Sequence, residues 1–200
     1  HAHKIMRKVW GGMPQKADIH TERWNQVADH VNDNFYHIDM DRYSLESVLA
    51  KGAELVKRKG IKCLVIDPFN KVRATTANDS DVNKYTMEYL MQIETFARKH
   101  DVLVIIVAHP TKMYKNDKGV IEVPTMYNIK GGGEWYDASY HGLVVHRNYL
   151  NKTVMVKVLK VKFQNLGENG AEVHFKWNPE SGGYIPHEQV SLEGTKMPWE

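Results

Sequence analysis

Residues 61–68 read Ile-Lys-Cys-Leu-Val-Ile-Asp-Pro, and residues 102–110 read Val-Leu-Val-Ile-Ile-Val-Ala-His-Pro. Each stretch is a short, nearly continuous apolar run that ends in a polar residue and a proline. Such runs are typical of parallel strands that helices cover on both faces. Apolar side chains at helical spacing predict helices over residues 45–59, after an N-capping Ser44, and over residues 82–100. This alternation predicts an α/β fold with a mostly parallel central sheet flanked by helices.

The other elements are predicted from shorter patterns. We expect helices over residues 4–9, over 21–34 and opening at 131–133, and strands over 35–38, over 143–146 and near Tyr184. Residues 111–130 form a polar loop. Residues 153–163 and 171–177 predict a C-terminal β-hairpin that closes around the glycines of residues 167–170.

The composition is that of an ordinary globular domain. Of the 200 residues, 42% are hydrophobic and 26% are charged, so a packed core is expected. No apolar run reaches the roughly 20 residues that cross a bilayer, which argues against a membrane partner. The net charge of +3 is too small to indicate nucleic acid by itself. Cys63 is the single cysteine, and we therefore expect a reducing cytoplasm as the location.

Two polar residues follow successive predicted strands. Ligands of open parallel sheets bind outside the carboxyl ends of the strands, and Asp67 and His109 occupy that position here. An aspartate there suits a phosphate-handling enzyme, since it can hold Mg²⁺ through water. Each residue alone is explained as well by a loop cap or a core histidine. Their occurrence at successive strand ends makes a functional site an equal alternative.

Four segments together resemble one protein family. Cys63–Asp67 resembles the Walker B strand of RecA-like ATPases, and residues 104–112 resemble the next conserved strand of the Twinkle and phage primase-helicase branch of the DnaB helicases. Residues 129–148 are similar to the fourth motif of that branch, and residues 158–163 to the strand that serves a neighbouring subunit. The order and spacing match over roughly residues 61–165, about half of the chain.

The resemblance implies an ATP-driven, ring-forming DNA helicase that hydrolyses ATP or another NTP with Mg²⁺. It implies that Asp67 positions Mg²⁺, that His109 senses the γ-phosphate and that Arg147 lies near the nucleotide or a DNA loop. It further implies that Lys160 and Lys162 complete the site of the next subunit in a homo-oligomeric, hexameric ring. Single-stranded DNA would pass a set of loop residues: Lys112, Lys115, Lys118, Lys130, Gly131, Gly132 and Gly133.

The sequence also departs from the family. The glycine-rich phosphate loop GxxxxGK[ST] and the catalytic glutamate are missing, and the chain begins at His1 without a methionine. We therefore expect residues 1–200 to be a single partial domain that lacks its N-terminal Walker A segment and has little ATPase activity alone. Tyr140 stands at a commonly acidic position. Lys162 stands where the family has an arginine finger and lacks its bidentate fork.

Some of these assignments have support from the residues themselves, and each has an alternative. Lys160 and Lys162 are two apart, so in a strand they point to one face, although lysines also protect exposed edge strands. The loop lysines suit an ordinary solvated loop equally well. Next to Lys130, the glycines of residues 131–133 would let the backbone approach a phosphate chain closely.

Two other functions remain open on the sequence. One is another RecA-like ATPase of recombination or repair, which would share the Asp67 strand but would not explain residues 109–112 followed by the glycine motif. The other is a non-enzymatic DNA-binding or assembly module of the same fold. For the helicase, a bacterial or phage-encoded protein is expected, with a primase domain as a possible attachment in the same polypeptide.

Overall fold

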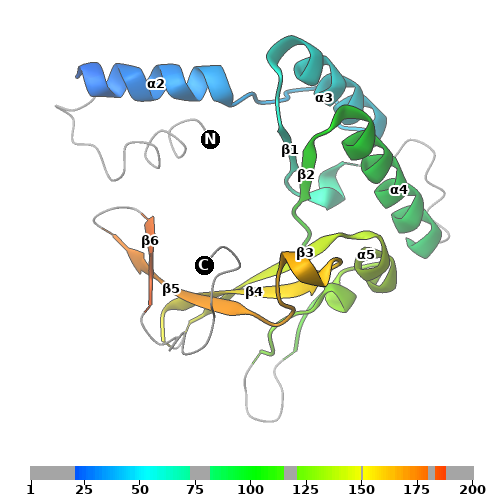
Figure 1. The fold of residues 1–200 in the computed structure, drawn as a ribbon. Coiled ribbons are helices and arrows are strands. Elements are labelled where there is room, and N and C mark those ends of the chain that lie inside the picture. Colours follow the sequence, from blue (N-terminus) through cyan, green and yellow to red (C-terminus); the bar gives the residue numbers. More distant parts are fainter. Residues whose placement is uncertain (1–20, 73–81, 115–120, 150, 180–182, 188–200) are drawn as a thin grey trace. The chain divides into compact units, whose positions relative to one another are not determined.

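The computed structural model describes residues 21–72, 82–114, 121–149, 151–179 and 183–187 (Figure 1). The helix expected over residues 4–9 lies outside them. The chain divides into two compact units. One contains residues 36–142 and 159–167, and the other contains the stretches up to residue 35, residues 143–158 and those from 168 on.

The first unit is built on the two strands that the apolar runs predict. β1 (Cys63–Ile66) and β2 (Leu103–Ile106) pair in parallel, from Cys63 opposite Leu103 to Ile66 opposite Ile106. α3 (Leu45–Lys59) precedes β1, and α4 (Val82–His100) precedes β2. The predicted alternation of helices and parallel strands is thus confirmed.

The ends of α3 follow from its sequence. The Ser44 hydroxyl accepts a hydrogen bond from the Ser47 N–H at 3.1 Å, which satisfies a first-turn donor that has no partner inside the helix. Gly60 ends the helix with φ of 65°, a left-handed conformation that glycine adopts without strain. The basic residues 57–59 fill the last turn, where the helix dipole favours positive charge.

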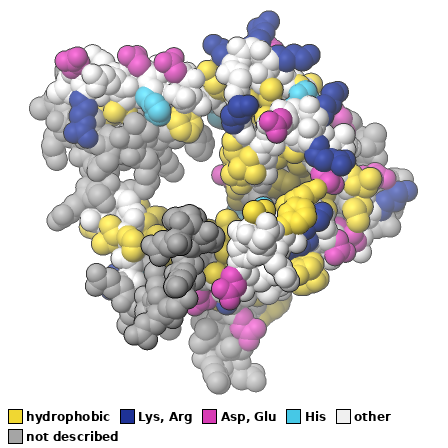
Figure 2. Space-filling view, in the orientation of Figure 1, with side chains coloured by type: hydrophobic (Ala, Val, Ile, Leu, Met, Phe, Trp, Pro, Cys, Tyr) yellow, Lys and Arg dark blue, Asp and Glu magenta, His cyan; other side chains and the backbone are white. Residues whose placement is uncertain are grey.

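The helices cover the strands on one side. Leu64 and Ile66 are buried, and they belong to the two clusters of core residues to which α3 and α4 contribute. Figure 1 shows both helices on the same side of the strands. The alternate side chains Val65 and Leu103 are 55% and 59% exposed, and Figure 2 shows hydrophobic side chains at the surface of this part of the molecule. The expectation of a sheet covered on both faces is wrong for the described residues, because none of their helices lies over the second face.

The second sheet has four strands in the order β3-β4-β5-β6. They are β3 (His141–Asn148), β4 (Thr153–Val161), β5 (Glu172–Asn178) and β6 (Gly183–Pro186). β4 and β5 pair antiparallel from Thr153 opposite Lys176 to Lys157 opposite Glu172, which confirms the predicted hairpin.

Two predictions in the N-terminal part had different outcomes. The polar helix is confirmed as α2 (Glu22–Asn34), capped by the Thr21 hydroxyl. The strand predicted over residues 35–38 is wrong. The segment is extended after Phe35, but no neighbouring strand among the described residues pairs with it, and an apolar pattern forms a strand only with such a partner. No described helix is long and apolar enough to cross a membrane.

Candidate functional site

Asp67 and His109 lie at the same edge of the parallel sheet. Ile66 and Ile106 end their strands side by side, and Asp67 follows the first of them directly. The pairing continues past the strands, because the Val107 N–H donates to the Ile66 carbonyl at 2.9 Å. Both Asp67 and His109 are exposed. The structure thus places the two residues at the carboxyl edge, where parallel sheets bind ligands.

The turn that carries Asp67 is anchored in the core. Phe69 packs edge-on against the rings of Tyr89 and Trp135, with centroid distances of 4.8 Å to each. The Phe69 N–H also donates to the Val107 carbonyl at 2.9 Å, which ties the turn to the segment before His109. Aromatic contacts of this geometry are favourable beyond the area that they bury. The position of the Asp67 main chain therefore depends on α4, on the segment after β2 and on Trp135.

The segment after His109 pairs with the segment before the glycine motif. Pro110 forms a bridge with Ile129, and the Thr111 N–H donates to the Asn128 carbonyl at 2.7 Å. The Trp135 indole N–H then donates to the Lys130 carbonyl at 3.1 Å. These bonds join the strand end of His109 to the main chain at Lys130, although about 20 residues separate them in sequence. A displacement of either segment would be transmitted to the other.

Packing accounts for two of the three glycines that open α5 (Gly132–Ala138). Gly131 has φ of 80°, and a Cβ there would lie 2.5 Å from the Thr86 hydroxyl oxygen. A Cβ on Gly132 would lie 2.4 Å from the Tyr127 carbonyl oxygen, whereas one on Gly133 would meet nothing within 4 Å. From the sequence, close approach to phosphate was the one role expected of these glycines. In the structure the first two are needed for packing inside the protein, and only Gly133 faces open space.

We expect Gly131→Ala to destabilise the fold and Gly133→Ala to be tolerated. The first change strains a left-handed residue and drives a methyl group into buried Thr86, which should lower the free energy of unfolding by about 2–4 kcal/mol. The second replaces an open helical glycine and should change it by less than about 1 kcal/mol, in the stabilising direction. Urea unfolding followed by circular dichroism measures both, and equal effects of the two variants would contradict the packing role.

Lys160 and Lys162 both contact α5 and the residues that follow it. The Lys160 ammonium donates to the carbonyls of Tyr136 and Asp137 and lies 4.6 Å from the centroid of the Tyr136 ring. These carbonyls belong to the last turn of the helix, where a cation is favoured. Lys162 lies one residue beyond β4, with its ammonium 4.1 Å from the Tyr140 ring centroid. Tyr140 stands out in the sequence as a departure from the family, but no local pattern predicts its pairing with Lys162.

Arg147 belongs to the other unit. Its guanidinium donates to the Tyr184 hydroxyl at 3.2 Å and lies 6.0 Å from the Tyr149 ring centroid. It also lines a groove of about 470 Å³, which is otherwise made of apolar and aromatic side chains: Val145, Val154, Val156, Phe175 and Tyr184. A planar cation beside aromatic rings suits the stacking of a flat ligand.

The lysines of the predicted DNA loop are only partly described. The Lys112 ammonium lies 5.5 Å from the Tyr114 ring centroid, and Lys130 is exposed. Lys115 and Lys118 lie outside the described residues.

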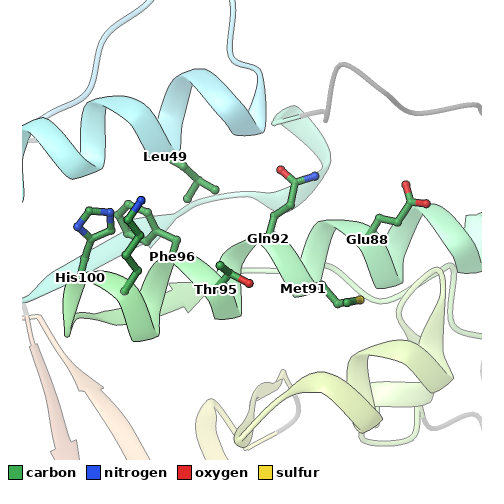
Figure 3. Close-up of a pocket in the computed structure, with 8 residues that line it drawn as sticks. Leu49, Glu88, Met91, Gln92, Thr95, Phe96 and His100 are labelled. Atoms are coloured by element: carbon green, nitrogen blue, oxygen red, sulfur yellow. The ribbon is translucent and has the colours of Figure 1, made fainter.

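A groove between α3 and α4 does not include the predicted site. It has a volume of about 540 Å³ and is lined by Leu49 of α3 and a row of residues along α4 (Figure 3). Neither Asp67 nor His109 borders it. Among the described residues there is also no group of three or more His, Cys, Asp or Glu side chains that could hold a metal ion. A single exposed carboxylate such as Asp67 fits Mg²⁺, because that ion keeps most of its waters and takes its remaining ligands from phosphates.

Similar proteins were found among curated sequences and solved structures, whereas no protein-family model matches the chain. The Twinkle homolog protein, chloroplastic/mitochondrial, of Arabidopsis thaliana is 30% identical over 201 residues, which are 92% of this chain and 28% of that protein. The chain thus spans less than a third of the length of this relative.

Two solved structures share the fold. The ATPase domain of a DnaB-like helicase superposes with a TM-score of 0.67 at 16% identity and covers 94% of this chain, which matches 70% of that one. A complete DnaB-like replicative helicase, whose interactions with primase were also described, superposes with a TM-score of 0.64 at 15% identity, over 92% of this chain and 47% of that one. The chain therefore has the RecA-like α/β fold of the ATPase domains of DnaB-like helicases, and its sequence is similar to that of a Twinkle homolog over nearly its whole length.

Proposed function

We propose that the chain is part of an ATP-dependent, ring-forming DNA helicase motor that couples NTP hydrolysis to movement along single-stranded DNA. The observation that carries this proposal is the hydrogen-bonded connection between the edge bearing Asp67 and His109 and the main chain at Lys130, through Pro110 and Ile129. A motor needs such a link between the place where phosphate is cleaved and the place where DNA is held.

Each candidate residue has a role in this proposal. ATP and Mg²⁺ supply the phosphoryl-transfer chemistry when they are bound. Asp67 holds the waters of the metal, and His109 contacts the γ-phosphate and transmits its presence to the segment at Pro110. Arg147 lies against the nucleotide. The DNA contacts are Lys112, Lys115, Lys130 and the glycine motif of residues 131–133, read through charge and main chain and without base recognition.

Lys160 and Lys162 serve the neighbouring subunit of a homo-oligomeric ring in this proposal. Lys160 binds the carbonyl end of α5 in its own subunit, which supports the strand that presents Lys162. Lys162 would place its positive charge near the phosphates of the next subunit.

We also propose that residues 1–200 are the C-terminal part of a larger RecA-like domain. They match 70% of the first solved ATPase domain and include no GxxxxGK[ST] loop. The exposed second face of β1 and β2, with Val65 and Leu103, is apolar as a covered sheet would be. A primase domain in the same polypeptide and a bacterial or phage-infected cytoplasm, where the Cys63 thiol stays reduced, belong to the same proposal.

The test of the function is unwinding by the complete polypeptide. It should separate a forked DNA duplex when ATP and Mg²⁺ are present, and single-stranded DNA should stimulate its ATPase. Asp67→Asn should abolish both activities and leave the protein folded. ATP hydrolysis without unwinding would favour a recombination or repair ATPase, and DNA binding without hydrolysis would favour a non-enzymatic module.

The isolated 200-residue chain should bind ATP weakly. Much of the affinity of such folds comes from a glycine-rich loop whose main-chain N–H groups cradle the phosphates, and the sequence contains no GxxxxGK[ST] motif. Calorimetry with Mg-ATP should give a Kd no tighter than about 100 μM, which corresponds to roughly 5.5 kcal/mol. Submicromolar binding would mean that another part of the chain forms the phosphate site.

A further inference from the structure

The ammonium of Lys162 is held over an aromatic ring. Its Nζ lies 4.1 Å from the Tyr140 ring centroid, inside the limit of about 6 Å at which a ring face attracts a cation. The main chain keeps the pair in register, because the Lys162 N–H donates to the Tyr140 carbonyl at 2.9 Å. The Phe163 ring also approaches Tyr140, with a centroid distance of 6.0 Å. The lysine and the ring are therefore joined at both main chain and side chain.

Tyr140 is fixed at its far end as well. Its hydroxyl donates to Glu94 Oε1 of α4 at 3.1 Å, and the same oxygen lies 3.9 Å from the Arg98 guanidinium. A ring that is held by its carbonyl on one side and by its hydroxyl on the other has little freedom to turn. Since Tyr140 is 36% exposed, the ring forms a platform at the surface and does not lie in the core.

This platform supplies what a lysine lacks at such a position. An arginine presents a planar fork in fixed geometry, whereas an ammonium on a flexible four-carbon stem must be ordered before it can act. Ordering the stem against a ring in the free protein reduces the entropy lost when the ammonium meets a phosphate. The contact also stays open to exchange, because a surface cation–π pair is weak compared with an ion pair to phosphate.

We propose that Tyr140 is a positioning residue for Lys162, and that its ring orients the ammonium toward the nucleotide of the neighbouring subunit. This inference rests on the proposed function, in which Lys162 acts across the subunit boundary. Tyr140 acts through Lys162 and touches neither nucleotide nor DNA. Its hydroxyl bond to Glu94 supports the ring, and the ring face makes the essential contact.

The test measures DNA-stimulated ATPase kinetics of the complete polypeptide for Tyr140→Leu and for Tyr140→Phe, which keeps the ring. Tyr140→Leu should lower kcat by about two- to fivefold, the effect expected from one surface cation–π contact, with KM for ATP unchanged. Tyr140→Phe should stay within about 1.5-fold of the parent. In a Lys162→Ala background, Tyr140→Leu should have no further effect on kcat, because the ring then has nothing to hold.

The outcomes separate this inference from the function on which it rests. If Lys162→Ala lowers kcat but Tyr140→Leu does not, the positioning role is wrong and the trans role of Lys162 stands. An effect of Tyr140→Leu that persists in the Lys162→Ala background also overturns it, because Tyr140 then acts elsewhere. If Lys162→Ala leaves kcat at the parent value, the trans role is wrong.

A spectroscopic measurement on the 200-residue chain tests the contact without any activity. Ring currents should shift the Lys162 side-chain methylene protons upfield in spectra of lysine-labelled protein. The shift should persist in Tyr140→Phe and vanish in Tyr140→Leu, while the signals of Lys57 on α3 stay unchanged as a control. Lys162 signals that are the same in all three proteins would show that the ring does not hold the ammonium.

Discussion

Subunits that carry Lys162→Ala, mixed with subunits that carry Asp67→Asn, are expected to recover ATPase activity that neither variant has alone. Lys162 adds positive charge where negative charge develops, and an arginine in such a role is worth about 10³-fold or more in rate. A lysine without the bidentate fork should be worth less, on the order of 10²-fold. Lys162→Ala alone should therefore lose nearly all DNA-stimulated activity while it still binds ATP.

The mixing experiment is needed because loss of activity alone does not distinguish a residue acting in its own subunit from one acting across the boundary. In an equimolar mixed ring, about a quarter of the interfaces join an intact Asp67 to an intact Lys162 of the adjacent subunit. The mixture should thus recover up to about a quarter of the parent activity. Lys57→Ala, which removes an exposed lysine of α3, is the control. Activity that never exceeds the sum of the two variants, in rings shown to be mixed, would leave Lys162 as a lysine that protects an exposed strand end.

Replacing His109 by alanine in the complete polypeptide is expected to uncouple DNA binding from hydrolysis. His109 directly precedes the segment in which Pro110 bridges Ile129 and Thr111 bonds to Asn128. If the imidazole reports the γ-phosphate to this segment, its loss should reduce the stimulation by DNA about tenfold, whereas KM for ATP should change less than about twofold.

Two measurements check this prediction. ATPase rates with and without single-stranded DNA give the stimulation, and the affinity for DNA with and without a non-hydrolysable ATP analogue gives the reciprocal coupling, which must fall by the same factor. His100→Ala, at the end of α4, is the matched control and should leave both unchanged. A His109→Ala protein that keeps its stimulation would make His109 a structural residue of the strand end.

The secondary structure was largely predictable, because its causes are local. The N-cap at Ser44, the stop at Gly60 and the helical spacing between them are properties of neighbouring residues, and the helix has the predicted bounds. The strand predicted over residues 35–38 was wrong for the opposite reason. A strand needs a partner elsewhere in the chain, and its own apolar residues do not supply one.

The placement of Asp67 and His109 was also predictable, because parallel strands joined by a helix bring their carboxyl ends to one edge. The reason for the glycine motif was not. Residues 131–133 look equivalent in sequence, yet Thr86 of α4 and the Tyr127 carbonyl leave no room beside the first two. Such a distinction depends on contacts between residues that are distant in the chain.

The sequence by itself determined the α/β class, the parallel pair of strands, the C-terminal hairpin and the position of two polar residues at strand ends. Each of these follows from periodicity, caps and chain connectivity. Only the tertiary structure decided that the segment after His109 pairs with the segment before Lys130, and that Lys162 rests on Tyr140, which is itself bonded to Glu94. No local pattern encodes these contacts, because each one exists only once the packing of α4 and α5 has brought its partners together.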